Sequence, residues 1–115
     1  MNPKSHRQAR WQVRRLLKLP RIEKSSRYLS ASTKKRTLAR AEAAAEAIWR
    51  YDQVGIWRWQ LQHVRWYLAV KLSDLTPRSR YQHFLAVQRV LVATDRSHWL
   101  PLLSEYSNGR PVVED

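Results

Sequence analysis

Apolar residues recur at intervals of three and four positions along most of the chain, which is the period of an amphipathic helix. This pattern predicts helices over about residues 6–19, 33–51, 60–72 and 77–94, followed by a last short helical piece that Pro101 interrupts. Two glycines and five prolines are too few turn residues for a multi-stranded sheet. We therefore expect an all-α protein, a small bundle of about four helices preceded by a basic helical arm.

Capping residues support two of these helices. Ser30 or Ser32 is a candidate N-cap for the alanine-rich helix, whose composition favours helix because alanine loses no side-chain entropy on folding. Thr76 suits the N-cap of the last long helix, and Pro77 suits its first position, where the missing N–H costs nothing. Gly55 is the expected stop of the alanine-rich helix.

Each long helix is expected to bury one side in a single core. In chain order, the predicted inward residues are Val13, Leu16 and Leu17; Leu38, Ala41, Ala45, Ile48 and Trp49; Trp57, Leu61, Val64 and Leu68; and Phe84, Val87 and Leu91, with Tyr81 and Leu85 beside them.

Six tryptophans are many for a chain of this length. Four of them lie at or near an apolar stripe and are interpreted as core residues: Trp49, Trp57, Trp66 and Trp99. Trp59 and Tyr67 are less clearly inward. For these two, contact with nucleic acid or with a partner remains open.

Basic and acidic residues are unevenly distributed along the chain. Residues 1–40 hold thirteen basic residues and one acidic residue, whereas residues 41–115 hold nine basic and eight acidic ones. We expect residues 1–29 to form a flexible basic arm and a linker, 30–104 a helical domain and 105–115 a frayed tail. Within the first segment, residues 20–32 are interpreted as a polar, serine-rich linker.

A formal net charge of +13 with a pI near 11.1 is typical of nucleic-acid binding. Arginine predominates over lysine, and its planar guanidinium binds phosphate with two parallel hydrogen bonds. Alternative roles for the charge are self-repulsion in solution, or binding to an acidic protein or a membrane surface.

The helix over 77–94 sharpens this interpretation, because no acidic residue occurs between Thr76 and Thr94. A solvated helix face usually mixes charges of both signs. The alanine-rich helix also begins with a cluster of cations, which oppose its dipole. The candidate DNA-binding residues of the two helices are Lys34, Lys35, Arg36, Arg40, Arg78, Arg80, Gln82, His83 and Arg89.

Catalytic and metal-binding motifs do not stand out. The chain has no cysteine, and no two of its four histidines are spaced as a pair of metal ligands. There is no glycine-rich phosphate loop and no nucleophile motif. We therefore expect a protein that is not an enzyme and has no cofactor and no metal. No apolar run approaches a membrane span, and a cytoplasmic location is expected.

Three segments together resemble a known family: "STKKRTLARAEAAAEAIW", "WQLQHVRWYLAVKL" and "LTPRSRYQHFLAVQRVL". In their order and capping they resemble the N-terminal core-binding domain of tyrosine recombinases, the phage-type integrases, over about residues 30–95. The resemblance implies a SAM-like helical bundle that clasps one side of a recombination site. It implies DNA contact by the basic start of the alanine-rich helix and the exposed face of the helix after Thr76.

The catalytic residues of that family belong to a second domain, and Tyr106 lacks the arginines that accompany the family's nucleophile. The expected function is therefore non-catalytic binding of double-stranded DNA, in recombination or its regulation. Two alternatives stay open: a basic helical protein associated with RNA or ribosomes, and an interaction module that docks on an intact recombinase or on itself.

Overall fold

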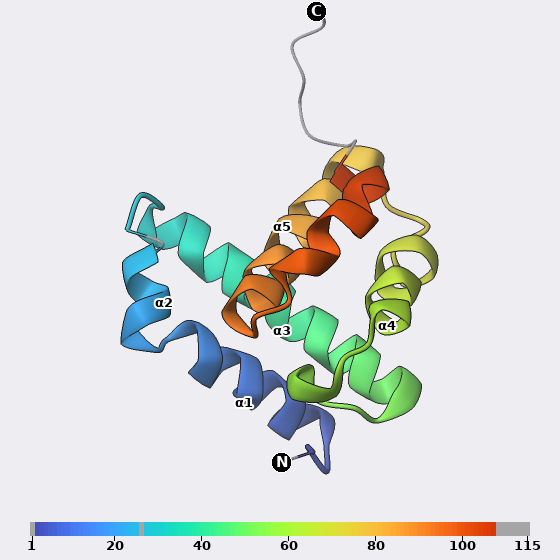
Figure 1. Cartoon of the computed structure of the whole chain (residues 1–115), viewed down its shortest axis with the longest axis horizontal. Helices are drawn as coiled ribbons and strands as arrows, with labels where there is room; N and C mark the ends of the chain where they lie inside the picture. Colours follow the sequence, from blue (N-terminus) through green and yellow to red (C-terminus); the bar gives the residue numbers. More distant parts are fainter. Residues whose placement is uncertain (1, 26, 108–115) are drawn as a thin grey trace, which may run out of the picture.

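A long alanine-rich helix, α3, runs through the molecule, and the first helix and the last long helix both pack against it (Figure 1). The computed structural model describes residues 2–25 and 27–107, so most of the predicted tail over 105–115 lies outside the described residues. The elements are α1 (His6–Leu17), α2 (Pro20–Ser25), α3 (Ala31–Asp52), the 3-10 helix η1 (Ile56–Arg58), α4 (Leu61–Trp66), the π-helix η2 (Tyr67–Lys71), α5 (Pro77–Ala93) and the 3-10 segment η3 (Ser97–Ser107). The described residues contain no strand, which confirms the all-α prediction.

The start of α3 follows the sequence, whereas its end does not. The Ser30 hydroxyl accepts a hydrogen bond of 3.1 Å from the Thr33 amide and caps the helix. The helix ends at Gln53, which adopts a left-handed conformation with φ 52°. The prediction that Gly55 ends it is wrong: Gly55 precedes η1 in an extended conformation with φ −86°. Glycine is needed there because a Cβ would collide with Pro3.

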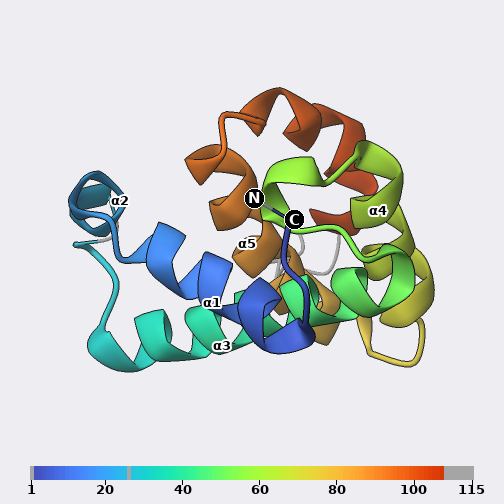
Figure 2. The same ribbon diagram turned by 90° about the horizontal axis from the view of Figure 1, so that it is seen from below.

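The helix α1 packs against α3 and runs antiparallel to it (Figures 1 and 2). Ala9, Val13, Leu16 and Leu17 are all buried in the common core. The expectation of a flexible arm is therefore wrong for α1. The apolar stripe is short, but α3 offers a surface of small alanine side chains that lets the two helices approach closely.

The segment over residues 20–32 is not only a linker. Pro20 is the first residue of the short helix α2. Its fixed φ suits the start of a helix. Ile22 of this short helix is buried. The chain thus turns at α2 before it returns along α3 (Figure 2).

The core is completed by α5, whose predicted inward residues Phe84, Val87 and Leu91 are buried. The segment α4–η2 buries Val64 and Leu68, as expected from their spacing. None of the described helices is both long and apolar enough to cross a membrane.

Three aromatic residues differ from expectation. Trp57 was assigned to the core but lies in η1 with 52% of its surface exposed. Trp59 and Tyr67 were left open for surface contact, and both are 2% exposed. The reason is local: residues 56–58 form a separate 3-10 turn, so the helical spacing counted from Trp57 does not continue into α4.

Candidate anion-binding groove

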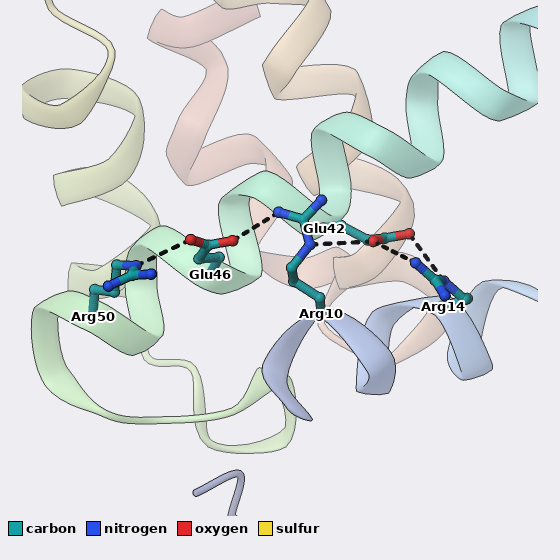
Figure 3. A network of polar contacts seen from close by, with 5 residues as sticks. All are labelled: Arg10, Arg14, Glu42, Glu46 and Arg50. Carbon is teal, nitrogen blue, oxygen red and sulfur yellow. Dashed lines mark hydrogen bonds and ion pairs between the residues drawn. The ribbon is translucent and has the colours of Figure 1, made fainter. Parts of the chain in front are cut away.

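Two of the four arginines of α1, Arg10 and Arg14, pair with carboxylates of α3 (Figure 3). The Arg10 guanidinium lies 3.4 Å from a carboxylate oxygen of Glu42 and 2.8 Å from one of Glu46. Arg14 donates to Glu42 at 3.1 Å, and Arg50 donates to Glu46 at 3.0 Å. These five side chains form one network that ties α1 to α3.

Protonation within this network follows from its contacts. The hydrogen bond to Glu42 raises the pKa of Arg14. Hydrogen bonds from Arg10, and next from Arg50, lower the pKa of Glu46 below 4.5. Glu46 and Arg50 are four residues apart on α3 and form an ion pair of 3.0 Å. These cations therefore serve the fold, since the two carboxylates offset two of their three positive charges.

Three other arginines donate hydrogen bonds to backbone carbonyl oxygens. Arg96 donates to the carbonyl oxygens of Ile56 and Trp57, at 2.6 Å each. Arg65 donates to the carbonyl of Leu102 at 3.3 Å, and Arg21 reaches that of Ala93 at 3.5 Å. Net charge alone therefore overstates the positive charge that a ligand can use.

Three further arginines, Arg36, Arg40 and Arg89, line a groove of about 580 Å³ between α3, α5 and the segment that leads into α3. Its described lining consists of Ile22, Tyr28, Leu29, Thr33, Arg36, Thr37, Arg40, Gln82, Leu85, Gln88, Arg89, Val92 and Ala93. We call this surface the arginine groove. No aspartate or glutamate occurs among these residues.

The three arginines of the groove have no side-chain partner in the described part of the chain. Within residues 2–25 and 27–107, the guanidinium groups of Arg36, Arg40 and Arg89 make no hydrogen bond and no ion pair. Arg40 and Arg89 are partly buried, and Arg36 is exposed. Like charges placed together without a carboxylate repel one another, so their gathering destabilises the free protein and favours an anion.

Four of the predicted DNA-binding residues thus meet in one place: Arg36 and Arg40 from α3, and Gln82 and Arg89 from α5. Their spacing of four and seven residues places each pair on one side of its helix. Arg78 is exposed and precedes Gln82 by one turn on the same side of α5.

The other predicted residues lie outside the lining of the groove. Lys34 is 3.6 Å from Glu23 and is therefore partly neutralised. Lys35 is exposed on α3. The Nε of Arg80 is buried without a hydrogen-bond partner in the described structure. Whether these residues contact DNA stays a prediction.

His83 also points elsewhere. Its Nδ1 lies 3.3 Å from the hydroxyl of Tyr67. Burial, and secondarily the nearby charge of Arg40, lowers the pKa of His83. Burial also raises the pKa of Tyr67 to about 12. The His83 ring is therefore neutral at pH 7 and adds no positive charge beside the groove.

Sequence reasoning missed four polar residues of the groove, Tyr28, Thr33, Thr37 and Gln88. Tyr28 lies in the segment taken as a linker, and no periodicity applies there. Gln88 follows the core residue Phe84 by four positions, so its spacing assigns it to the core side of α5. Only the packed structure shows that it lines the groove. A second hollow of about 540 Å³ lies near the other end of α3, and it contains the carboxylate of Glu46 beside its cations.

The histidine that is most buried has a structural role. Nδ1 of His63 accepts a hydrogen bond of 2.8 Å from the Gln60 amide, and Nε2–H points at Asp52, 2.6 Å away. This pair fastens the end of α3 to the start of α4. Among residues 2–25 and 27–107, no group of three or more histidine or carboxylate side chains is placed to hold a metal ion.

Comparisons with protein-family models, with curated proteins and with solved structures find no match to this chain.

Proposed function

We propose that this protein is a non-catalytic double-stranded DNA-binding protein whose arginine groove and adjoining cations bind backbone phosphates. One observation carries the proposal: Arg36, Arg40 and Arg89 converge from two helices on one groove, with no carboxylate among its described lining residues. By contrast, Arg10, Arg14 and Arg96 are paired with carboxylates or carbonyl groups.

A phosphate group would meet arginine donors that are already held in position by rigid helices. Arginine on a rigid helix presents a fork of donors to phosphate with little loss of side-chain freedom. Both α3 and α5 are anchored by buried residues, so the groove is preorganised. Lys35 and Arg78 extend the positive surface along the same two helices, which suits a polyanion better than a single small anion.

The resemblance to the core-binding domain of tyrosine recombinases supports duplex DNA as the ligand and recombination or its regulation as the setting. Within that proposal the protein acts as a clamp without a catalytic role, in the cytoplasm, alone or with a recombinase or a second copy of itself. The groove offers no histidine or carboxylate among its described residues that could act as a general acid or base.

The test is a salt titration of binding to a labelled duplex, followed by fluorescence anisotropy. If about five phosphates are neutralised, log K should fall with log salt with a slope of about −4 to −5. Replacing Arg36, Arg40 and Arg89 together with alanine should reduce the magnitude of that slope by about 3, because each phosphate contact contributes about 0.9.

A matched variant removes the same charge elsewhere. Arg7, Arg58 and Lys71 are exposed and lie outside the arginine groove. Replacing these three with alanine should leave the slope within about 1 of the wild-type value. Equal losses in the two triple variants would mean that net charge binds DNA and that the groove does not.

The same titration separates the alternatives. Structured RNA that outcompetes duplex DNA at equal salt would favour the RNA-associated role. A slope near zero for both nucleic acids would contradict the proposal and favour docking on another protein.

A further inference from the structure

The arginine groove is larger and more apolar than contact with phosphates requires. Phosphates lie on the outside of the duplex, so donors on the protein surface reach them without an apolar hollow. Here Ile22, Leu29, Leu85, Val92 and Ala93 line a hollow of about 580 Å³ together with the arginines. Hollows of this size take compact, partly apolar ligands.

An aromatic ring stands beside this hollow. Tyr28 lines the groove, and 79% of its surface is exposed. Exposing a large aromatic side chain to water is unfavourable in free energy. Such a ring can serve as a surface on which a nucleobase stacks.

Two amide side chains complete the lining. Gln82 and Gln88 come from α5, and their side-chain amides make no hydrogen bond within the described part of the chain. A glutamine amide offers both donors and an acceptor, which match the edge of a base. The groove thus combines phosphate donors, an apolar wall, an open ring and base-edge partners.

We propose that the arginine groove holds one unpaired nucleotide, with its phosphate on the arginines and its base against Tyr28 and the apolar wall. This inference rests on the proposed function and refines it. The preferred ligand is then a duplex with an extrahelical or unpaired base rather than an uninterrupted duplex. A paired base is stacked inside the duplex and cannot enter a hollow on the protein.

An acidic peptide is the competing occupant with similar charge. A helical peptide needs an elongated groove that accepts side chains at successive turns, about 5 Å apart. The arginine groove is a single hollow whose charges are arginines suited to phosphate oxygens. The nucleotide therefore fits its lining better.

The experiment compares three labelled duplexes of equal length with the full chain, by anisotropy at one salt concentration. One duplex is intact, one carries a single-nucleotide bulge, and one carries an abasic bulge with the same backbone charge. We expect the base-containing bulge to bind about 5- to 100-fold more tightly than the other two, as stacking of one base on an aromatic ring provides.

The variants Tyr28→Ala and Tyr51→Ala provide a matched pair. Both tyrosines are exposed, but Tyr51 stacks on Trp66 with ring centroids 3.9 Å apart, outside the arginine groove. Tyr28→Ala should remove most of the preference for the bulge, so that the variant binds the base-containing and abasic bulges with affinities within about twofold of each other. Tyr51→Ala should keep the preference.

The outcomes distinguish the two proposals. Equal affinity of wild type for all three duplexes, with the expected salt slope, overturns this inference and leaves phosphate binding intact. Equal preference for the base-containing and abasic bulges also overturns it, because a flexible backbone then suffices. Salt-independent or absent binding to every duplex overturns the proposed function and this inference together. Displacement of the bulged duplex by a polyglutamate peptide, but not by adenosine monophosphate, assigns the groove to acidic peptides instead.

Discussion

At the scale of the residue, the same side chain has two different roles in this protein. Arg10 and Arg14 lie against Glu42, whose surface is only 4% exposed, and they help to build the fold. Among the residues that the structure describes, Arg36 and Arg89 have no carboxylate partner, and they remain available to a ligand. The difference depends on whether a neighbouring helix brings a carboxylate within reach.

Glu42→Ala should lower the free energy of unfolding by about 1–2 kcal/mol. The variant removes the hydrogen bonds from Arg14 and the ion pair with Arg10, and a hydrogen bond to a charged group is worth about 1.5–3 kcal/mol. The loss is smaller here because both guanidiniums can turn to water. Urea denaturation followed by circular dichroism measures the change.

Glu105→Ala is the control, because Glu105 is exposed and its loss should change stability by less than about 0.5 kcal/mol. Equal midpoints for the two variants would show that the network of Figure 3 adds nothing to stability.

At the scale of the element, α5 combines a core side and a ligand side. Phe84 and Val87 are buried, whereas Gln82 and Arg89 line the groove. The helix begins as its sequence predicts: the Thr76 hydroxyl accepts a hydrogen bond of 3.2 Å from the Ser79 amide, and Pro77 occupies the first turn. The cap therefore fixes the register in which the groove residues are presented.

Thr76→Ala should cost about 1 kcal/mol of stability, because the Ser79 amide loses its acceptor. Thr76→Ser keeps the hydroxyl and should restore stability to within a few tenths of a kcal/mol. Thermal unfolding of both variants measures the effect. If alanine and serine behave alike, the hydroxyl does not cap α5 in solution.

At the scale of the whole molecule, α1 is a part of the bundle and not an appendage. It contributes Ala9, Val13, Leu16 and Leu17 to the same core as α3 and α5. The chain passes through α2 and returns along α3, so its first and longest helices lie side by side (Figures 1 and 2).

Leu16→Ala should therefore destabilise the whole protein by about 2–5 kcal/mol, as expected for a buried leucine that leaves a cavity. Leu16 is 3% exposed, whereas Leu19 just after α1 is 40% exposed. Leu19→Ala should cost less than about 1 kcal/mol. A single unfolding transition, measured by calorimetry for both variants, checks the size of each effect.

An α1 that behaves as a flexible arm would give a different result. Both substitutions would then leave the main transition unchanged, since neither leucine would touch the core.

Much of the helical structure was readable from local signals. The alanine-rich composition, the caps at Ser30 and Thr76 and the inward residues of α5 act over a few positions along the chain, and all of them are confirmed. The errors at Trp57 and Gly55 occur where a short 3-10 turn interrupts the helical period. A period counted along the sequence cannot register such an interruption.

The sequence by itself determined the all-α class, the main helices and an excess of positive charge, because propensity, capping and composition are properties of neighbouring residues. Only the tertiary structure decided which arginines are neutralised and which remain open. Arg10 and Glu46 are 36 residues apart, and Arg36 and Arg89 meet across two helices. Such pairings depend on how helices pack in three dimensions, and the local sequence around each residue does not determine them.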